Sequence, residues 1–378
     1  MRFIHLSDLH LGLRLNKFSL LEDQSYILDR IFEIIGELGA DAVIIAGDIY
    51  DKPVPPAEAV SLFDSFITRL SDAGIKTLMI SGNHDSAERV AFGSGVMSRG
   101  GIHIAPVYDG KTKPVVLHDG FGDIFVYLLP FLKPSSVRRY FPDKTITTHN
   151  DALKAAVGAI ETDTSARSII VSHQFVTGAV TCDSEEIYVG GLENVDASIY
   201  EKFDYAALGH IHRPQNIAGE RIRYCGTPLK YSFSEANDQK SVTVIDMKEK
   251  GNVSVDTVPL TPLHDLREIR GTYMELTSPK SYTEENRRDY IKAVLNDETE
   301  INMAMDRLRA VYPNIMQLSY DNTATRTLTG QGISAAPERR SPVELACDFY
   351  KLRSGTDISE EKKAIIQRMI EEIAEEDI

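Results

Sequence analysis

The sequence predicts an α/β fold built on a layered sheet, and two observations support this prediction. Short apolar runs at 3–6, 42–46 and 75–80 alternate with longer segments in which apolar residues recur at helical spacing. Strands that alternate with helices along a chain pair in parallel through right-handed crossovers. Each of these apolar runs also stops at polar residues, and the ends of parallel strands are where α/β sheets place their chemistry.

The first elements follow from the apolar residues and from the residues that interrupt them. Gly39 and Gly74 suit the ends of helices, and Pro55-Pro56 suits a helix start. The run at 42–46 is continuously apolar, which is typical of a parallel strand covered on both faces. We therefore expect strands at 3–6, 42–46 and 75–80, and helices at 20–38 and 55–70.

The same patterns continue the layered fold to residue 264. We expect helices at 86–97 and 151–160, strands at 102–105, 115–117, 124–129, 168–172 and 204–208, and a hairpin of strands at 241–246 and 253–258. Residues 130–140 mix basic and aromatic side chains, so we expect a loop that is either solvated or lies along a nucleic-acid backbone. Residues 178–198 are polar and are expected to form a long loop.

The character of the sequence changes after Pro262. A strand at 268–276, helices at 283–295 and 301–311 and a strand at 315–320 are expected to form an α+β unit. Residues 323–340 have the composition of a linker, and 341–378 predict two amphipathic helices, which would dock on another protein. The predicted domains are therefore 1–264, 265–322, a linker at 323–340, and a helical pair at 341–378.

Composition limits the classes of protein to which the chain can belong. Its 378 residues exceed the comfortable size of one core. A formal net charge of -15 argues against non-specific coating of nucleic acid, although it leaves room for a local basic groove. Three cysteines suit a reducing compartment, and no apolar run is long enough to cross a bilayer. We expect a cytoplasmic protein.

Residues with metal-ligand chemistry follow five of the predicted strands. They are Asp8-Leu9-His10, Gly47-Asp48, Gly82-Asn83-His84, Ser172-His173 and Gly209-His210-Ile211-His212. Two histidines separated by one residue are the strongest single ligand signal, because core histidines usually occur singly. Asp8 and His10 are alternate residues, so in an extended segment they would point the same way and share a cation. The remaining histidines are expected to be structural or on the surface: His5, His103, His118, His149 and His264.

The candidate ligands offer oxygen and imidazole donors without a thiolate. They are Asp8, His10, Asp48, Asn83, His173, His210 and His212. This set suits Mn(II), with Fe(II), Co(II) or Zn(II) as competitors. Seven donors exceed what one ion takes from a protein, so we expect two ions bridged by a carboxylate such as Asp48, the arrangement used in phosphoester hydrolysis. His84 would donate a proton or hydrogen bond to the leaving oxygen.

These motifs, in this order, resemble the calcineurin-like metallophosphoesterase superfamily. Five longer stretches are similar to the SbcD family, the nuclease subunits of bacterial SbcCD complexes: 5–12, 46–51, 173–176, 209–215 and 226–233. The resemblance covers nearly the whole chain. It implies a β sandwich flanked by helices, with a small α+β capping domain at 265–322 and a C-terminal helical pair at 341–378.

The resemblance also implies a role for each candidate residue. It places one manganese on Asp8, His10, Asp48 and His212 and the other on Asp48, Asn83, His173 and His210, and it makes His84 the catalytic acid. The implied activity is Mn-dependent cleavage of double-stranded DNA ends and hairpins in DNA recombination, replication and repair. Archaeal and eukaryotic relatives tend to have histidine where this chain has Asp51, so cleavage polarity does not carry over.

The resemblance further implies partners and a location. It implies a homodimer formed by helices of the nuclease domain, and docking of the C-terminal helices on the coiled-coil base of SbcC, an ATPase. The chain has no phosphate-binding Gly-x-x-x-x-Gly-Lys sequence, so ATP hydrolysis would come from that partner. The expected location is the cytoplasm, in association with the nucleoid.

Two other functions account for part of the sequence. A phosphomonoesterase or cyclic-nucleotide phosphodiesterase would keep the metal centre, and the acidic balance favours it slightly, but it would not require residues 267–378. A DNA-end scaffold with a vestigial site would be no enzyme, and the intact ligand residues at every motif position argue against it.

Overall fold

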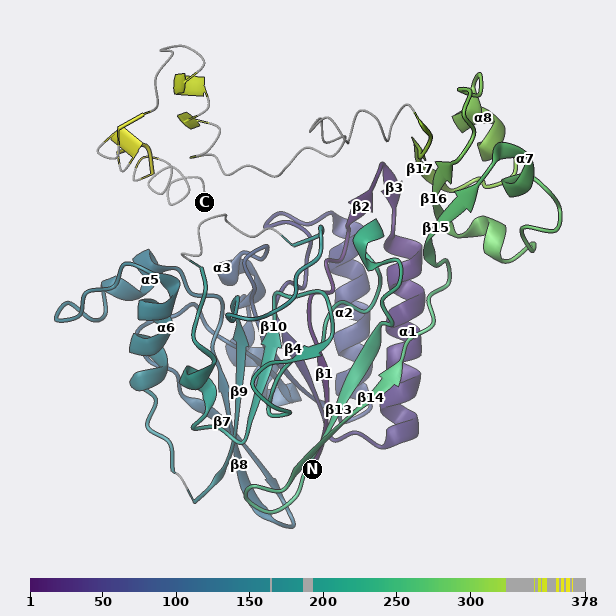
Figure 1. Ribbon diagram of the computed structural model, residues 1–378. Coiled ribbons are helices and arrows are strands. Elements are labelled where there is room, and N and C mark those ends of the chain that lie inside the picture. The colour runs from purple at the N-terminus through teal and green to yellow at the C-terminus, as the bar shows by residue number, and fades with distance from the viewer. Residues whose placement is uncertain are drawn as a thin grey trace.

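The computed structural model describes residues 1–163, 165–185 and 193–323, together with scattered residues between 343 and 369. Its main body has four layers: two six-stranded sheets pack face to face, and helices cover the outer face of each (Figure 1). The predicted fold class, an α/β sandwich flanked by helices, is confirmed.

The first sheet is built on four parallel strands that follow the predicted alternation of strand and helix. In sheet order it runs β14 (Val253–Pro259), β13 (Ser241–Met247), β1 (Arg2–Leu6), β4 (Ala42–Ala46), β5 (Lys76–Ile80) and β6 (Ile102–Ile104). The predicted hairpin, β13 and β14, adds to β1 in antiparallel orientation. The outer face of this sheet is covered by α1 (Leu21–Leu38) and α2 (Ala57–Asp72).

The second sheet has a parallel centre with an antiparallel strand at each edge. In sheet order it runs β11 (Gln215–Asn216), β12 (Ile222–Tyr224), β10 (Tyr205–Gly209), β9 (Arg167–His173), β8 (Gly122–Leu128) and β7 (Pro114–Asp119). Its outer face is covered by α5 (Pro134–Arg138) and α6 (His149–Gly158).

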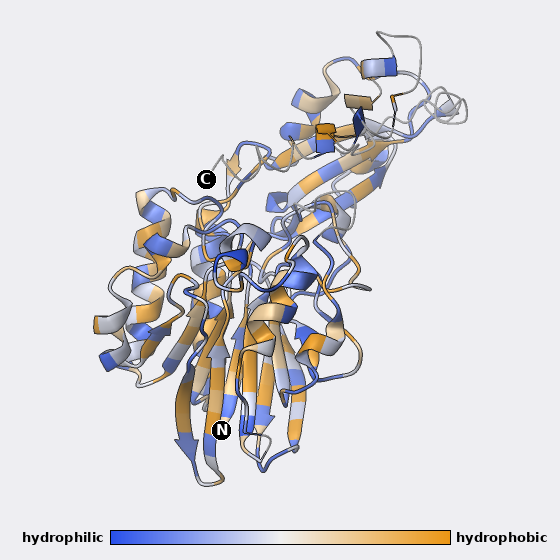
Figure 2. Ribbon diagram, turned by 90° about the vertical axis from the view of Figure 1, so that its left-hand side faces the viewer, coloured by the Kyte–Doolittle hydropathy of each residue, from blue (hydrophilic) through white to orange (hydrophobic). Residues whose placement is uncertain are grey.

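The central strands are apolar throughout because both of their faces are buried. Successive side chains of a strand point to opposite faces, so each face needs its own apolar residues. In β4, Ala42, Ile44 and Ala46 face the other sheet, whereas Val43 and Ile45 face the helices. All five are fully buried, and the strands are correspondingly rich in apolar residues in Figure 2. The carboxyl ends of β1, β4, β5, β9 and β10 lie at one rim of the two packed sheets.

Two predictions for the segments between the strands are wrong. The single helix expected at 86–97 is two short helices, α3 (Ala87–Val90) and α4 (Ser94–Met97), because Gly93 adopts a left-handed backbone with φ 73° between them. The loop expected at 130–140 contains α5, which begins at Pro134, a residue that suits the first turn of a helix.

Residues 266–320 form a small unit with its own core and a parallel sheet in the order β15 (Leu266–Gly271), β16 (Tyr290–Leu295) and β17 (Ile315–Tyr320). It also contains α7 (Tyr273–Leu276) and α8 (Ala304–Arg309). The helix predicted at 283–295 is wrong, since its second half is the central strand β16. The strand predicted at 268–276 ends at Gly271, where Thr272 caps α7.

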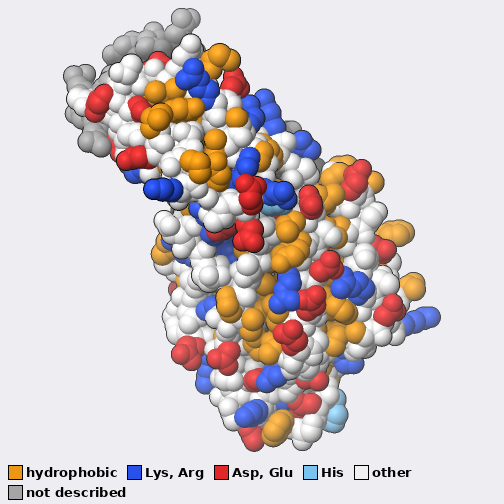
Figure 3. Space-filling view, turned by 90° about the vertical axis from the view of Figure 1, so that its right-hand side faces the viewer, with side chains coloured by type: hydrophobic (Ala, Val, Ile, Leu, Met, Phe, Trp, Pro, Cys, Tyr) orange, Lys and Arg blue, Asp and Glu red, His pale blue; other side chains and the backbone are white. Residues whose placement is uncertain are grey.

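The small unit is fastened to the first turn of α1. Tyr290 Oη donates to Asp23 Oδ2 at 2.8 Å, and the backbone N–H of His264 donates to Asp23 Oδ1 at 3.0 Å. Leu266 and Tyr290 also belong to the core beneath α1. Figure 3 shows the face that carries both parts, on which acidic and basic side chains are intermixed.

The predicted linker at 323–340 lies outside the described residues except for residue 323, and most of the predicted helical pair at 341–378 also lies outside them. Among the helices that are described, none combines the length and apolar character needed to cross a membrane.

Candidate metal centre

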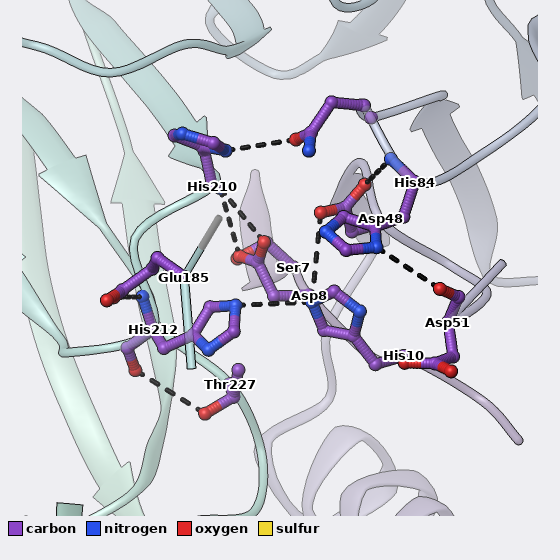
Figure 4. A network of polar contacts seen from close by, with 12 residues as sticks. Ser7, Asp8, His10, Asp48, Asp51, His84, Glu185, His210, His212 and Thr227 are labelled. Atoms are coloured by element: carbon purple, nitrogen blue, oxygen red, sulfur yellow. Dashed lines mark hydrogen bonds and ion pairs between the residues drawn. The ribbon is translucent and has the colours of Figure 1, made fainter. Parts of the chain in front are cut away.

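All seven predicted ligands gather at the rim where the carboxyl ends of the parallel strands meet. Figure 4 labels Asp8, His10, Asp48, His210 and His212 among them. The first sheet supplies Asp8 and His10 after β1, Asp48 after β4 and Asn83 after β5. The second sheet supplies His173 at the end of β9, and His210 and His212 after β10. The site therefore exists only because the two sheets pack with these rims together.

The ligand atoms form two groups. In the first, single donor atoms of Asp8, His10 and His212 lie within 4.8 Å of one another, and the Nε2 atoms of the two histidines are 3.2 Å apart. In the second, Asn83 Oδ1 lies 3.0 Å from His173 Nε2 and 3.0 Å from His210 Nδ1. Imidazole nitrogens that converge on oxygen atoms in this way form a suitable cradle for a transition-metal cation.

Asp48 lies between the two groups. Its Oδ2 is 3.2 Å from His173 Nε2 and 3.7 Å from His10 Nε2. A single carboxylate that reaches ligands of both groups is suited to bridging two cations, as the sequence predicts for Asp48.

Four of the ligands have backbone conformations that L-residues rarely adopt. Asp8, His10, Asp48 and His210 have φ values of 52°, 42°, 47° and 99°. Asp8 and His10 therefore converge through left-handed turns, and the expectation that they share an extended segment is wrong. Such strained residues cluster at functional sites, where the surrounding packing offsets their cost.

Three glycines that precede ligands allow the loops to approach closely. A Cβ atom on Gly82 would lie 2.5 Å from the backbone nitrogen of Asp48, and one on Gly209 would lie 2.7 Å from His173 Nδ1. A Cβ on Gly47 would lie 2.9 Å from the same imidazole, at Cγ. These separations are shorter than real Cβ contacts, so each glycine is required by the space around it.

Hydrogen bonds from outside the two groups hold the ligands in place. His173 Nδ1 donates to the carbonyl of Ala46 at 2.8 Å, so Nε2 is the ring nitrogen that faces the site. Asp85 accepts from three backbone N–H groups, those of Ile49, Tyr50 and Gly82, at 2.9–3.1 Å, and thereby joins the loops after β4 and β5.

The electrostatics of the site favour bound positive charge. Burial lowers the pKa of His10 to about 4 and of His210 to about 3, so both imidazoles are neutral, as metal ligands must be. Burial alone would also lower the pKa of His173, but the adjacent Asp48 carboxylate raises it to about 9. The Asp48 carboxylate therefore stabilises positive charge at the centre of the site. The oxygen and nitrogen donors around it suit a divalent transition metal.

His84 lies beside the first group, where it can meet a substrate. Its backbone N–H donates to Asp48 Oδ1 at 2.9 Å, and its ring centroid is 4.8 Å from that of His10. Because Nδ1 donates to the carbonyl of Asp51 at 3.1 Å, the atom left to hold or release a proton is Nε2. The side chain is only partly buried, which suits a group that acts on substrate.

The histidines that were not assigned to the site belong to neither ligand group. His5 is buried in β1 against Tyr205, His118 is exposed beside Asp123, and His264 contacts Asp23. His149 begins α6 and packs near Phe131. His103 lies in β6 at the edge of the first sheet.

Sequence reasoning missed several residues that support the ligands. Gln24 donates to the carbonyl of His10 at 2.7 Å, and Glu185 accepts from the backbone N–H of His212 at 2.8 Å. Ser184 contacts His212 from the other side, and its hydroxyl in turn donates to the fully buried Glu235. Glu235 comes just after the stretch 226–233, which resembles the family, and this position could have indicated a role near the site. The stretch itself has no pattern typical of metal ligands.

Comparison with known proteins gives two matches to family models. Residues 1–214 match the model described as calcineurin-like phosphoesterase, and residues 262–354 match the model described as type 5 capsule protein repressor C-terminal domain. The D subunit of the nuclease SbcCD from Staphylococcus epidermidis is 35% identical over 323 residues, which cover 84% of this chain and 85% of that protein.

Solved structures align at lower similarity. A dimetal phosphatase from Danio rerio has a TM-score of 0.40 and 10% identity, and the alignment covers 69% of this chain and 99% of that one. The protein TT1561 of Thermus thermophilus has a TM-score of 0.38 and 12% identity, with 68% of this chain and 98% of that one covered. On the family-model match and the 35% identity, the chain belongs to the calcineurin-like phosphoesterase family and, within it, to the SbcD group of nuclease subunits.

Proposed function

We propose that this chain is the nuclease subunit of an SbcCD-type complex and hydrolyses DNA phosphodiester bonds with two manganese ions. The proposed reactions are exonucleolytic cleavage at double-stranded ends and endonucleolytic cleavage in hairpins, in DNA recombination, replication and repair. The observation that carries this proposal is the convergence of seven ligand residues into two groups that share Asp48, in a chain 35% identical to the D subunit of an SbcCD nuclease.

The residues divide naturally between two cations. One Mn(II) would be held by Asp8, His10, Asp48 and His212, and the other by Asp48, Asn83, His173 and His210. When bound, the pair of divalent ions would activate water and neutralise charge on the phosphoryl oxygens. The mixture of carboxylate, amide and imidazole donors, with no thiolate among them, suits Mn(II) better than a thiolate-rich structural zinc site.

His84 would serve as the catalytic acid. Its Nδ1–H is held by the Asp51 carbonyl, so its Nε2–H can be aimed at the leaving oxygen of the scissile phosphodiester. The backbone bond from His84 to Asp48 fixes the spacing between this acid and the carboxylate between the two groups. Replacing His84 by Gln should abolish cleavage while metal binding is kept. Full cleavage by this variant would contradict the role of His84 as the acid, whereas a wild-type chain that binds DNA ends without cleaving them would favour the DNA-end scaffold.

The proposed partners are DNA, a second copy of the chain and an SbcC-type ATPase. Four apolar side chains on and beside α2, α3 and α4 are exposed, which supports dimer formation through these helices: Val54 by 70%, Val60 by 42%, Phe92 by 83% and Val96 by 74%. The small unit would act as a capping domain, and residues 341–378 would dock on the ATPase. We place this assembly in the cytoplasm, in association with the nucleoid.

A small-molecule phosphoesterase is the second candidate, and the net charge of -15 favours it. The two functions are separated by assaying the purified chain with Mn(II) on hairpin DNA and on p-nitrophenyl phosphate esters. The proposal predicts cleavage of the hairpin. Turnover of the small esters alone would contradict it.

A further inference from the structure

The imidazole of His212 makes a hydrogen bond on the side that faces away from the proposed metal centre. Its Nε2 faces His10 Nε2 at 3.2 Å, inside the first ligand group, whereas its Nδ1 lies 2.7 Å from Ser184 Oγ. The two ring nitrogens therefore have separate environments, one open to a cation and the other facing a hydroxyl.

The Ser184 hydroxyl leads on to a buried carboxylate. Ser184 Oγ lies 2.6 Å from Glu235 Oε1, and Glu235 is fully buried. A carboxylate only accepts hydrogen bonds, so the serine donates its proton to Glu235 and is left to accept one from His212 Nδ1. This direction places the imidazole proton on Nδ1 and leaves the Nε2 lone pair pointing into the first ligand group.

Lys240 contacts both the Glu235 carboxylate and the backbone of His212. Its Nζ lies 2.5 Å from Glu235 Oε2 and 2.8 Å from the backbone carbonyl of His212. The lysine is itself buried, and burying an ion pair carries a desolvation penalty. The attraction between the two charges and the hydrogen bonds of both groups offset this penalty. The pair holds the backbone of His212 through Lys240 and its ring through Ser184, so this residue is fixed at two points.

We propose that Ser184 and Glu235 are positioning residues that set the tautomer and orientation of His212 for cation binding. The inference rests on the proposed metal centre and adds to it a relay from Glu235 through Ser184 to the imidazole. The second ligand group is arranged differently, because His173 Nδ1 donates to the backbone carbonyl of Ala46. Loss of the relay therefore weakens one cation site and leaves the other. Outer carboxylates of this kind change metal affinity by about 10- to 100-fold.

Binding of Mn(II) to the purified full chain, followed by electron paramagnetic resonance of the free ion, tests the relay. Ser184→Ala removes the hydroxyl and keeps the Glu235–Lys240 pair, so one of two Mn(II) equivalents should bind about 10- to 100-fold more weakly. Ser184→Thr restores the hydroxyl and should recover the affinity. Ser232→Ala is the matched control, because the Ser232 hydroxyl also donates to Glu235, at 2.9 Å, but makes no hydrogen bond to the described side chain of His212.

The outcomes separate the relay from the metal centre. Two equivalents that bind to Ser184→Ala as tightly as to the wild type would overturn the relay and leave the proposed function intact. Equal weakening by Ser184→Ala and Ser232→Ala would also overturn it, since general loosening around Glu235 would then be the cause. A wild-type chain that binds fewer than two Mn(II) would remove the proposed centre and the relay with it.

Discussion

Gly82 is the residue whose replacement by alanine should most directly disturb the site. A Cβ atom there would meet the side chain and the backbone nitrogen of Asp48, the carboxylate that lies between the two ligand groups. We expect Gly82→Ala to bind Mn(II) at least about 10-fold more weakly because Asp48 must shift. Titration calorimetry with Mn(II) measures this.

Gly36 provides the control for that substitution. It lies within α1, and a Cβ atom added there would meet nothing within 4 Å. Gly36→Ala should leave Mn(II) binding unchanged and raise the free energy of unfolding by about 0.5–1 kcal/mol, since alanine favours the helix. Equal Mn(II) affinities for the two variants would contradict the steric argument.

His5 should make stability depend on pH. It is fully buried, and burial lowers its pKa from about 6.5 to about 3. Below about pH 6.5, His5 binds a proton in the unfolded chain but not in the folded chain. The neutral imidazole therefore contributes fully to the free energy of unfolding above that pH, and this contribution is lost as pH falls toward 3. When the pH falls from 7 to 5.5, this difference in proton binding should lower the free energy of unfolding by about 1 kcal/mol.

Urea unfolding at the two pH values, with the metal chelated, checks this prediction. In His5→Leu the loss between pH 7 and pH 5.5 should be smaller than in the wild type by about 1 kcal/mol. His118→Gln is the control, because His118 is exposed at the surface. An identical pH response of wild type and His5→Leu would show that the buried imidazole has no part in it.

The convergence of the candidate ligands could be predicted from the sequence, but the residues that support them could not. Asp48 and His173 each end an apolar run, and a local pattern reveals that. The relay to His212 joins Ser184 and Glu235, which are 51 residues apart, and no local pattern connects them. The left-handed backbone of His10 was also missed, since only the packed loops impose it.

At the scale of elements, strands of the sandwich could be predicted because they alternate regularly with helices. The failure at β16 has a physical cause. Five of the six residues of Tyr290–Leu295 are buried, so the strand is apolar on both faces and shows no alternation. A short apolar run of this kind has no period that distinguishes a strand from a helix. The pairing with β15 and β17 decides the structure instead.

The junction between α1 and the small unit gives a prediction at the same scale. Tyr290→Phe removes the hydroxyl that donates to the buried Asp23, leaving the carboxylate with one partner fewer. We expect an unfolding free energy lower by about 1–3 kcal/mol. Hydrogen exchange should rise in the first turn of α1 and around 264–266.

Tyr312→Phe is the matched control for the junction. The Tyr312 hydroxyl donates to the carbonyl of Leu276 within the small unit, at 2.8 Å. This variant should raise exchange near α7 and leave α1 unchanged. If Tyr290→Phe left exchange in α1 at the wild-type level, the Asp23 contact would have no role in fastening the small unit.

For the whole molecule, the proposed division of labour predicts the effect of a truncation. Deleting residues 341–378 should leave Mn-dependent cleavage of simple DNA substrates and abolish its stimulation by the ATPase with ATP, because the docking segment is lost. Cleavage assays with and without the ATPase measure both quantities. A truncated chain that still responds fully to ATP would contradict the docking role.

The account as a whole depends on two cations bound where the two sheets bring their rims together. Anomalous scattering at the manganese edge, from a crystal grown with Mn(II), tests this most directly. We predict two peaks that share Asp48, one also beside Asp8, His10 and His212 and the other beside Asn83, His173 and His210. A single peak, or none among these residues, would contradict the account.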